Sequence, residues 1–404
     1  MRSSTSLPFG AVSKELATRL EAEAEGLVQH HVRAYEAHLY YQNRQELRDP
    51  RVWRRVQSNG KQGFSVYRRV RRRRDQSSAG NTTKTGLALS RLNGPAPGPQ
   101  GCSNSSNSSG ASAALSALSS SALPTQLLGI GFTIGTIEDM IFGSVANTTA
   151  AIKIQSLYVN DPIVDAAVLA VLMPPNGNDP LRSVTLKWIL KKPKMYGVTR
   201  HRDYVFVESI GIRRSVSGER IGYHLMHSVE LPSFPPLSAD DAVVRRRFSS
   251  CYLYRSIGSG LIECFLRSST DPWRSTPEPL VIHAAANRLL QCCPGFMRVA
   301  ETNKLIFALQ HEMRNAKDRP ARRHEDPTSC HSCLKNFHMC KRGHPCQLCE
   351  QICCSRCLIV WKTSFAFSLL SEASVLEKRL RFCRSCMISA QAANPLHIAA
   401  TRLC

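Results

Sequence analysis

Apolar residues at helical spacing mark the first element of the chain. Residues 13–45 are rich in Ala and Glu, which are good helix formers, and Ser13 is a suitable N-cap. One loose face of this segment carries Leu16, Leu20, Leu27, Val32 and Leu39. The pattern predicts an amphipathic helix, followed by a turn at Asp49-Pro50 and a strand that ends at Arg69.

Alternation of apolar and polar positions predicts a sheet in the middle of the chain. Within 183–191 every second side chain is apolar, and Lys187 lies on the opposite face from Trp188. A hairpin turn is expected at Gly218-Glu219, between two of the strand-like runs. The further strand-like runs are 129–132, 204–210, 221–229, 250–254 and 260–266.

Helical patterns lie on both sides of this sheet region. A short helix is expected over 135–143, and longer ones over 279–293 and 296–314. The dipeptide Pro294-Gly295 separates the last two and predicts a kink or a break there. A helix, an antiparallel meander and a long C-terminal helix together indicate an α+β fold.

Composition bounds the rest of the organisation. A length of 404 residues with 43% apolar side chains predicts two globular domains, and no apolar run is long enough to span a bilayer. Residues 77–124 are rich in Ser, Gly, Asn and Pro, which predicts disorder. The first thirteen residues lack the apolar core of a signal peptide, so we expect a cytoplasmic protein.

The charge balance points to an acidic partner. Lys and Arg outnumber Asp and Glu by 53 to 30, giving a formal net charge of +23. Such an excess attracts anionic lipid or nucleic acid, and charge alone does not choose between them. The arginine block 68–74 is compatible with an import signal, a membrane contact or a solvated flank of the disordered segment.

Ten of the sixteen cysteines lie between Cys330 and Cys386, mostly in C-x2-C pairs. Two such pairs can supply the four thiolates of one structural zinc site, so the four pairs predict two Zn2+ ions. A disulfide framework would need an oxidising compartment, for which the chain carries no signal. Four thiolates leave no open coordination position, which argues against a metal hydrolase. The eight predicted ligands are Cys330, Cys333, Cys346, Cys349, Cys354, Cys357, Cys383 and Cys386.

The sequence around the second pair, Arg342-Gly343-His344-Pro345-Cys346-Gln347-Leu348-Cys349-Glu350, resembles the FYVE finger. The family pattern is R-[RK]-H-H-C-R-x-C-G, followed by a further C-x2-C. The resemblance implies a cross-braced module that binds phosphatidylinositol 3-phosphate on endosomal membranes. It assigns the first and third cysteine pairs to one zinc and the second and fourth pairs to the other. It also implies phosphoinositide binding by Lys341, Arg342 and His344, and membrane insertion by His338 and Met339.

Several positions depart from the family pattern. Gly343, Pro345, Gln347 and Glu350 replace a basic residue, a histidine, an arginine and a glycine. Phosphate recognition needs converging donors, preferably bidentate arginine, so these changes remove part of the expected pocket. A scaffold that binds only protein partners is therefore an alternative. A RING-type ubiquitin ligase is a further alternative, although only one residue separates His344 from the next cysteine.

The region before the finger resembles a START-like domain. The resemblance rests on Trp53, Lys187-Trp188, and the stretches 66–69, 202–207 and 218–224. It implies a helix-grip fold, in which a curved antiparallel sheet covers a long C-terminal helix and a cavity between them holds a hydrophobic ligand. No catalytic motif appears, and isolated His224 and His227 should point to opposite faces of a strand as structural residues.

The expected organisation follows from these features. We expect a START-like domain over 10–70 and 127–314, interrupted by a disordered insert at 71–126, then a linker over 315–326. A FYVE-like finger over 327–390 and a tail over 391–404 complete the chain. The predicted function is non-enzymatic, with a hydrophobic ligand, an anionic endosomal membrane and a protein as candidate partners. We expect no nucleic-acid partner.

Overall fold

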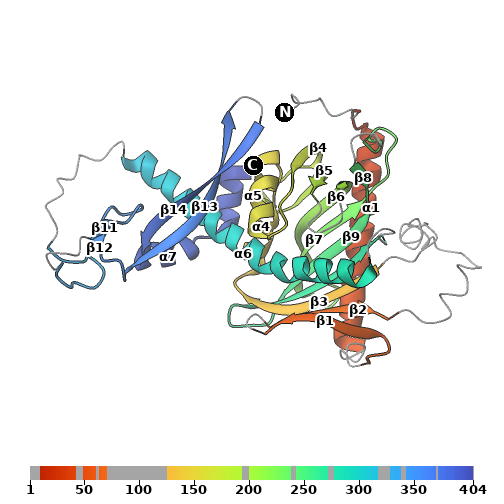
Figure 1. The fold of residues 1–404 in the computed structure, drawn as a ribbon, viewed down its shortest axis with the longest axis horizontal. Helices are drawn as coiled ribbons and strands as arrows, with labels where there is room; N and C mark the ends of the chain where they lie inside the picture. Colours follow the sequence, from red (N-terminus) through yellow and green to blue (C-terminus); the bar gives the residue numbers. More distant parts are fainter. Residues whose placement is uncertain are drawn as a thin grey trace, which may run out of the picture.

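The computed structural model describes residues 10–41, 49–60, 63–70, 125–192, 200–237, 243–271, 277–316, 328–337, 343–369 and 372–403. A twisted and curved antiparallel sheet lies between helices on both of its faces (Figure 1). The predicted α+β class, with a curved sheet over a C-terminal helix, is confirmed. Nearly all of the predicted insert 71–126 lies outside the described residues, and its last two residues begin strand β3.

The sheet has ten strands in the order β1-β2-β3-β10-β9-β7-β6-β5-β4, and β8 pairs in parallel with β6. All neighbours along the main path are antiparallel, as short hairpin connections favour. The strand expected before residue 69 is a hairpin of two strands. The strands are β1 Trp53–Asn59, β2 Phe64–Arg69, β3 Thr125–Ile134, β4 Asp165–Met173, β5 Ser183–Lys191, β6 His201–Arg214, β7 Arg220–Ser228, β8 Val243–Arg245, β9 Phe248–Ser256 and β10 Leu261–Thr270.

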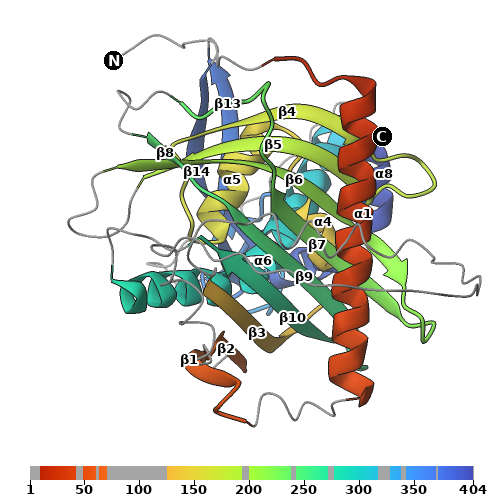
Figure 2. The ribbon, with the colours of Figure 1, turned by 90° about the vertical axis from the view of Figure 1, so that its right-hand side faces the viewer.

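Helix α1, Lys14–Glu36, covers the outer face of the sheet (Figure 2). The hydroxyl of Ser13 accepts a hydrogen bond from the amide of Leu16, so the predicted N-cap is confirmed. The apolar side of α1, with Leu20, Leu27 and Val32, packs on apolar side chains of β5, β6, β7 and β9. A short π-helix, η1 Ala37–Tyr41, continues from α1.

The long helix α6, Glu278–Ala316, covers the inner face. It continues through Pro294, so of the predicted kink or break, the break is wrong. Proline costs a helix interior about 3 kcal/mol, and tertiary packing offsets it here. Cys293 and Phe296, on either side of Pro294-Gly295, are both buried in the core beneath the sheet.

Two shorter helices pack against α6. They are α4, Ile137–Ser144, and α5, Thr149–Tyr158. A Cβ atom added to Gly143 would lie 1.9 Å from the carbonyl oxygen of Phe296, and one on Gly295 would lie 2.8 Å from that of Tyr158. Glycine therefore permits the close approach of α4 and α5 to α6.

The C-terminal part follows α6. Strands β13 Leu358–Leu369 and β14 Glu372–Cys383 form a long hairpin that lies against α5 and α6 (Figure 1). The expected tail contains helix α8, Pro395–Leu403, and its Ile398 and Ala399 are buried in the core beneath the sheet. The remaining elements are β11 His344–Pro345, β12 Ile352–Cys353 and α7 Arg384–Gln391.

None of the helices within the described ranges is long and apolar enough to cross a bilayer.

Candidate functional site

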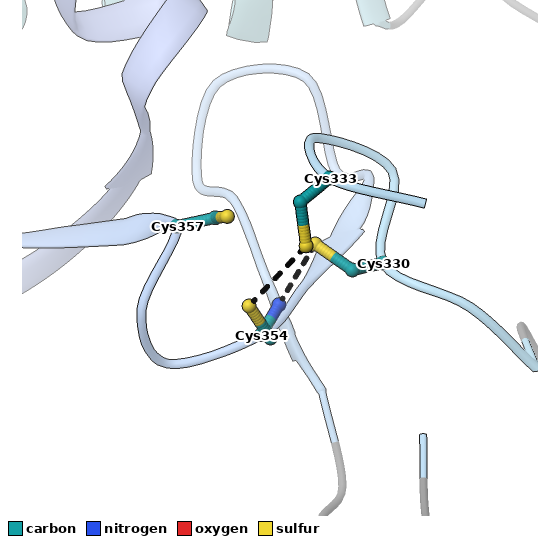
Figure 3. Close-up of side chains that lie close together, drawn as sticks. All are labelled: Cys330, Cys333, Cys354 and Cys357. Atoms are coloured by element: carbon teal, nitrogen blue, oxygen red, sulfur yellow. Dashed lines mark hydrogen bonds between the residues drawn. The ribbon is translucent and has the colours of Figure 1, made fainter. Parts of the chain in front are cut away.

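The first and third cysteine pairs meet in one cluster. Cys330 and Cys333 lie in a turn before β11, and Cys354 and Cys357 lie in the turn between β12 and β13 (Figure 3). Their four sulfur atoms lie within 4.8 Å of one another. The amide of Cys354 also donates to Cys330 Sγ at 3.2 Å, which ties the two turns together.

The second and fourth pairs meet in another cluster. Cys346 and Cys349 belong to the turn after β11, whereas Cys383 ends β14 and Cys386 lies in the first turn of α7. Their sulfur atoms also lie within 4.8 Å of one another. The two clusters therefore interleave along the chain, in the pairing that the FYVE resemblance implies.

The sulfur spacing fits a tetrahedral metal ion. Zinc–sulfur bonds of about 2.3 Å place the four sulfur atoms of a tetrahedron about 3.8 Å apart. Cys333 Sγ lies 3.9 Å from Cys354 Sγ, and Cys349 Sγ lies 3.8 Å from Cys383 Sγ. A disulfide would need about 2.05 Å. The donor set of each cluster can hold one zinc ion.

Local amides and hydroxyls favour the thiolate form of one cysteine in each cluster, Cys330 and Cys383, whereas the pKa values of Cys349, Cys357 and Cys386 are raised. Burial raises the pKa of Cys330, but amide donors from Cys354, Cys333 and Ser332 outweigh it and lower this pKa to about 6. Burial also raises the pKa of Cys383. Hydrogen bonds from Ser385 and the amide of Cys386 outweigh burial and lower this pKa to about 7. Hydrogen bonds to the charged form explain both lowered pKa values.

A second candidate site is a cavity of about 500 Å³ between the inner face of the sheet and the helices α5 and α6. This volume lies in the range of about 300–1,000 Å³ typical of small-molecule sites. The sheet and both helices contribute to its walls. The apolar side chains that line it are Ile152, Val159, Ile163, Ile189, Phe206, Met226, Phe248, Val281 and Phe296.

A buried charged group closes one end of the cavity. The ammonium of Lys187 pairs with the carboxylate of Glu208, and His224 Nε2 lies 3.0 Å from the other oxygen of that carboxylate. Burial tends to raise the pKa of Glu208, but the charge of Lys187 and the hydrogen bond from His224 outweigh it, and the pKa is lowered. The side chains of Lys187, Glu208 and His224 are almost fully buried, and the Lys187–Glu208 ion pair balances its charge within the protein.

One buried polar atom of this group is left over. His224 Nδ1 has no hydrogen-bond partner among the described residues. The ring stacks on Tyr252, with centroids 5.6 Å apart, and also contacts Phe296. When Nε2 donates to Glu208, Nδ1 of the neutral ring is an acceptor. His224 lines the cavity, so a ligand with a hydroxyl or amide could satisfy it.

The predicted opposite orientation of His224 and His227 is confirmed. His224 faces the cavity, whereas His227 lies on the outer face, where its Nε2 is 3.8 Å from a carboxylate oxygen of Glu23 in α1. The adjacent cysteines of α6 are buried, as expected, and Tyr252 donates to Cys292 Sγ at 3.2 Å. Burial raises the pKa of Cys292 to about 12, which makes it a poor nucleophile.

The predicted phosphoinositide residues are only partly within the described chain. Lys341 and Arg342, and the predicted membrane-inserting residues His338 and Met339, lie outside it. His344 is exposed on β11.

Two departures from the FYVE pattern have structural roles. Gln347 Oε1 accepts a hydrogen bond of 3.0 Å from the backbone amide of Arg381. The backbone amide of Gln347 donates to the carbonyl oxygen of Arg381 at 2.9 Å. A Cβ atom on Gly343 would lie 2.3 Å from Ile352 and 2.6 Å from Phe337. In this chain, therefore, Gln347, which replaces the family arginine, is hydrogen-bonded to β14. At Gly343, which replaces a basic residue of the family, a side chain would clash with Ile352 and Phe337 unless they moved.

Sequence reasoning missed the charged side chains of the cavity. Lys187 and Glu208 each interrupt an apolar strand, which is a signal for a buried pair, but nothing local in the sequence joins them. They meet because the register of β5 and β6 places Lys187 opposite Phe206, diagonally next to Glu208.

No family model matches the chain, and no curated protein matches its sequence. Among solved structures, human STARD10 aligns with a TM-score of 0.39 and 10% identity, covering 68% of this chain and 83% of that one. Human StAR-related lipid transfer protein 5 aligns with a TM-score of 0.38 and 13% identity, covering 72% and 98%. The human StarD13 (DLC2) lipid transfer and protein localization domain aligns with a TM-score of 0.35 and 10% identity, covering 65% of this chain and 95% of that one.

These structural neighbours are START (StAR-related lipid transfer) domains. At TM-scores below 0.5 and identities of 10–13%, the likeness assigns neither a family nor a ligand to this chain.

Proposed function

We propose that this protein is a non-enzymatic binding protein that holds one hydrophobic ligand between its sheet and α6. The observation that carries the proposal is the inner cavity of about 500 Å³, with mostly apolar walls and with His224 Nδ1, which has no hydrogen-bond partner among the described residues. Cavities lined by apolar side chains with a few convergent polar groups are the usual form of ligand sites.

The cysteine clusters act as two structural zinc sites in this proposal. Each supplies four thiolates, which completes the coordination of zinc and leaves no position for a substrate. Zinc would stabilise the module over 327–390, which is too short to fold on an apolar core alone.

We further propose that this zinc module docks the protein on an anionic membrane. Strand β14 and the start of α7 present exposed basic side chains at Lys378, Arg379, Arg381 and Arg384, and His344 is also exposed. Each basic residue near an anionic surface contributes about 1 kcal/mol. Endosomal phosphatidylinositol 3-phosphate is the specific target that the FYVE resemblance implies.

A protein-binding scaffold is the second candidate, and a specific observation favours it. Gln347 is hydrogen-bonded to the backbone of β14, and Gly343 has no space for a basic side chain. Both positions would have to supply phosphate ligands in a complete FYVE pocket. A module without them can still present the rigid hairpin β13–β14 to another protein.

Ligand binding can be tested by closing the cavity from α6. Ala284 and His283 are both exposed neighbours on α6, but only Ala284 lines the cavity. The full zinc-loaded chain with Ala284→Trp should lose binding of a fluorescent fatty alcohol, and His283→Trp should retain it. Equal binding by wild type and both variants would place the probe elsewhere and remove the proposal.

Membrane docking can be tested by liposome co-sedimentation of the full chain at two salt concentrations. Binding that prefers phosphatidylinositol 3-phosphate and persists at raised salt would support the specific target. Binding to any anionic liposome that is lost at raised salt would indicate a generic basic surface. If no liposome binds, and binding appears only with Pro345→His and Gln347→Arg together, the scaffold is the better description.

A further inference from the structure

The partly open end of the cavity carries a marked excess of positive charge. Among the described residues, the side chains of Lys191, Lys192, Arg202 and Arg288 line it, together with one carboxylate, that of Asp161. Lys191, Asp161 and Arg288 keep 19%, 17% and 32% of their side-chain surface exposed. The closed end differs, because Lys187 there is matched by Glu208 and both are buried.

Lys191 of β5 and Arg288 of α6 reach the same carboxylate oxygen of Asp161. The ammonium of Lys191 pairs with Asp161, and Arg288 Nε of α6 lies 4.0 Å from the same carboxylate oxygen. Lys191 and Arg202 are direct partners across β5 and β6, so their side chains share the inner face. The Lys191 ammonium also lies 5.7 Å from the ring centre of Tyr204.

The basic side chains at this end influence one another's pKa. Burial lowers the pKa of Arg288, but Asp161 and Tyr204 outweigh it and raise this pKa. Burial lowers the pKa of Lys191, Asp161 opposes this, and the charge of Arg288 lowers it again. Burial also lowers the pKa of Arg202; Tyr204 opposes this, and Arg246 and Arg288 lower the pKa further. Like charges repel more where water is partly excluded. An anion placed among them would relieve that repulsion.

The rest of the cavity indicates what the anion must be attached to. Between the basic end and the closed end lie Ile189 of β5 and its partner Tyr204 of β6. Phe206 and Met226 line the cavity beside Lys187 and Glu208, and Phe248 packs on Tyr204 and Phe206. Lys187 and Lys191 are four residues apart on the same face of β5, a separation of about 13 Å at the usual rise per residue. The site therefore combines an anion pocket at the opening with an apolar chamber behind it.

We propose that the ligand of this cavity is an amphipathic acid, whose carboxylate or phosphate lies among Lys191, Arg202 and Arg288 and whose apolar body fills the chamber towards His224. This inference rests on the proposed ligand-binding function and names its ligand class. It assigns the head-group site to side chains of β5, β6 and α6.

The test compares ligands that share one apolar chain and differ only in the head group. Oleate, oleoyl lysophosphatidate and the uncharged oleyl alcohol are titrated, below their aggregation concentrations, into the full zinc-loaded protein by displacement of a fluorescent fatty alcohol. A charged hydrogen-bonding group contributes about 1.5–3 kcal/mol, so at least one acid should bind roughly ten- to a hundredfold more tightly than the alcohol. The tighter acid distinguishes a carboxylate ligand from a phosphate ligand.

Charge-removing variants locate the head group. Arg288→Gln leaves the Lys191–Asp161 pair in place and should weaken binding of the acid about tenfold while changing alcohol binding less than twofold. Arg288→Lys should restore most of the acid preference. Arg220→Gln is the matched control, because Arg220 is half exposed and pairs with Glu138 outside the cavity. It should change neither affinity.

The outcomes separate this inference from the proposed function. If neither acid nor alcohol binds, the ligand-binding function itself fails. If both acids bind no better than the alcohol, or if Arg288→Gln weakens acid and alcohol equally, the cavity holds an apolar ligand and the acidic head-group assignment is overturned. The wild-type comparison decides this even if a variant fails to fold.

Discussion

The indole Nε1 of Trp361, in β13, donates a hydrogen bond of 3.0 Å to the hydroxyl of Thr302, in α6. The guanidinium of Arg298 lies over the same indole ring, 4.1 Å from its centre. On α5, the hydroxyl of Tyr158 accepts a hydrogen bond of 3.1 Å from the amide of Ser364. The hairpin of the zinc module is thus fixed to the two helices that also form one wall of the cavity.

This contact predicts an energetic coupling between Trp361 and Thr302. Trp361→Phe should lower the free energy of unfolding by about 1–3 kcal/mol, because it removes a buried hydrogen bond and part of a buried ring. In a double-mutant cycle with Thr302→Val, measured by denaturant unfolding, the coupling energy should be about 1 kcal/mol.

The neighbouring Val360 supplies the control. Its side chain points away from α6 and is 56% exposed, so Val360→Ala should change stability by less than about 0.5 kcal/mol. A coupling energy near zero for Trp361 and Thr302 would mean that the hairpin is not held against α6 in solution.

Metal content should follow the two clusters separately. We expect two zinc ions per wild-type chain by elemental analysis, and one in the Cys354→Ser or the Cys386→Ser variant, since each removes one ligand of a four-sulfur site. Cys353 is adjacent to Cys354 and fully buried but belongs to neither cluster, so Cys353→Ser should retain two ions. Two ions in all the variants would contradict the assignment of ligands.

The C-x2-C pairs could be anticipated because metal ligands follow local spacing rules, whereas the grouping of the pairs into two clusters was implied only by the FYVE resemblance. Each C-x2-C pair is a short turn whose geometry depends on nearby residues, such as the amides that reach Cys330. The continuity of α6 could not be anticipated in the same way. Pro294 predicts a break locally, and only contacts with distant segments, such as that of Gly295 with Tyr158, decide otherwise.

The charged residues of the cavity show the same limit. The alternation within β5 assigned Lys187 to the face opposite Trp188, which is correct, but an exposed face and a ligand cavity give the same sequence pattern. Asp161, Lys191 and Arg288 come from a loop, a strand and a helix, so no spacing in the sequence connects them. Only the sheet register and the path of α6 bring them together.

Helix α8 should contribute to the stability of the sheet domain although it follows the zinc module in the chain. Ile398 is 1% exposed and lies in the core with side chains of α4 and α6. Ile398→Ala should therefore cost about 2–5 kcal/mol in the free energy of unfolding. Ile388, in α7, is 59% exposed, and Ile388→Ala should change it by less than about 0.5 kcal/mol. Equal effects would show that α8 is not packed in solution.

Two buried histidines on the outer face predict that stability falls as the solution becomes acidic. Burial, with the charge of Arg267, lowers the pKa of His31 to about 3, and burial lowers that of His227 to about 4. In the unfolded chain both titrate at about 6.5. Below that pH the unfolded state binds protons that the folded state does not, so folding stability decreases with falling pH.

The expected slope is about 1.4 kcal/mol per pH unit for each histidine once the unfolded imidazole is protonated, and it continues down to the folded-state pKa. Denaturant unfolding at pH 7, 6 and 5 should therefore show a loss of about 2 kcal/mol between pH 6 and pH 5 from the two residues together. His31→Gln and His227→Gln should each remove about half of that loss, whatever their effect at pH 7. His283→Gln, which replaces an exposed histidine of α6, should leave the slope unchanged. Because protonation of the zinc ligands affects all the variants equally, an identical slope in wild type and in both buried-site variants would show that these histidines are not buried neutral in the folded protein.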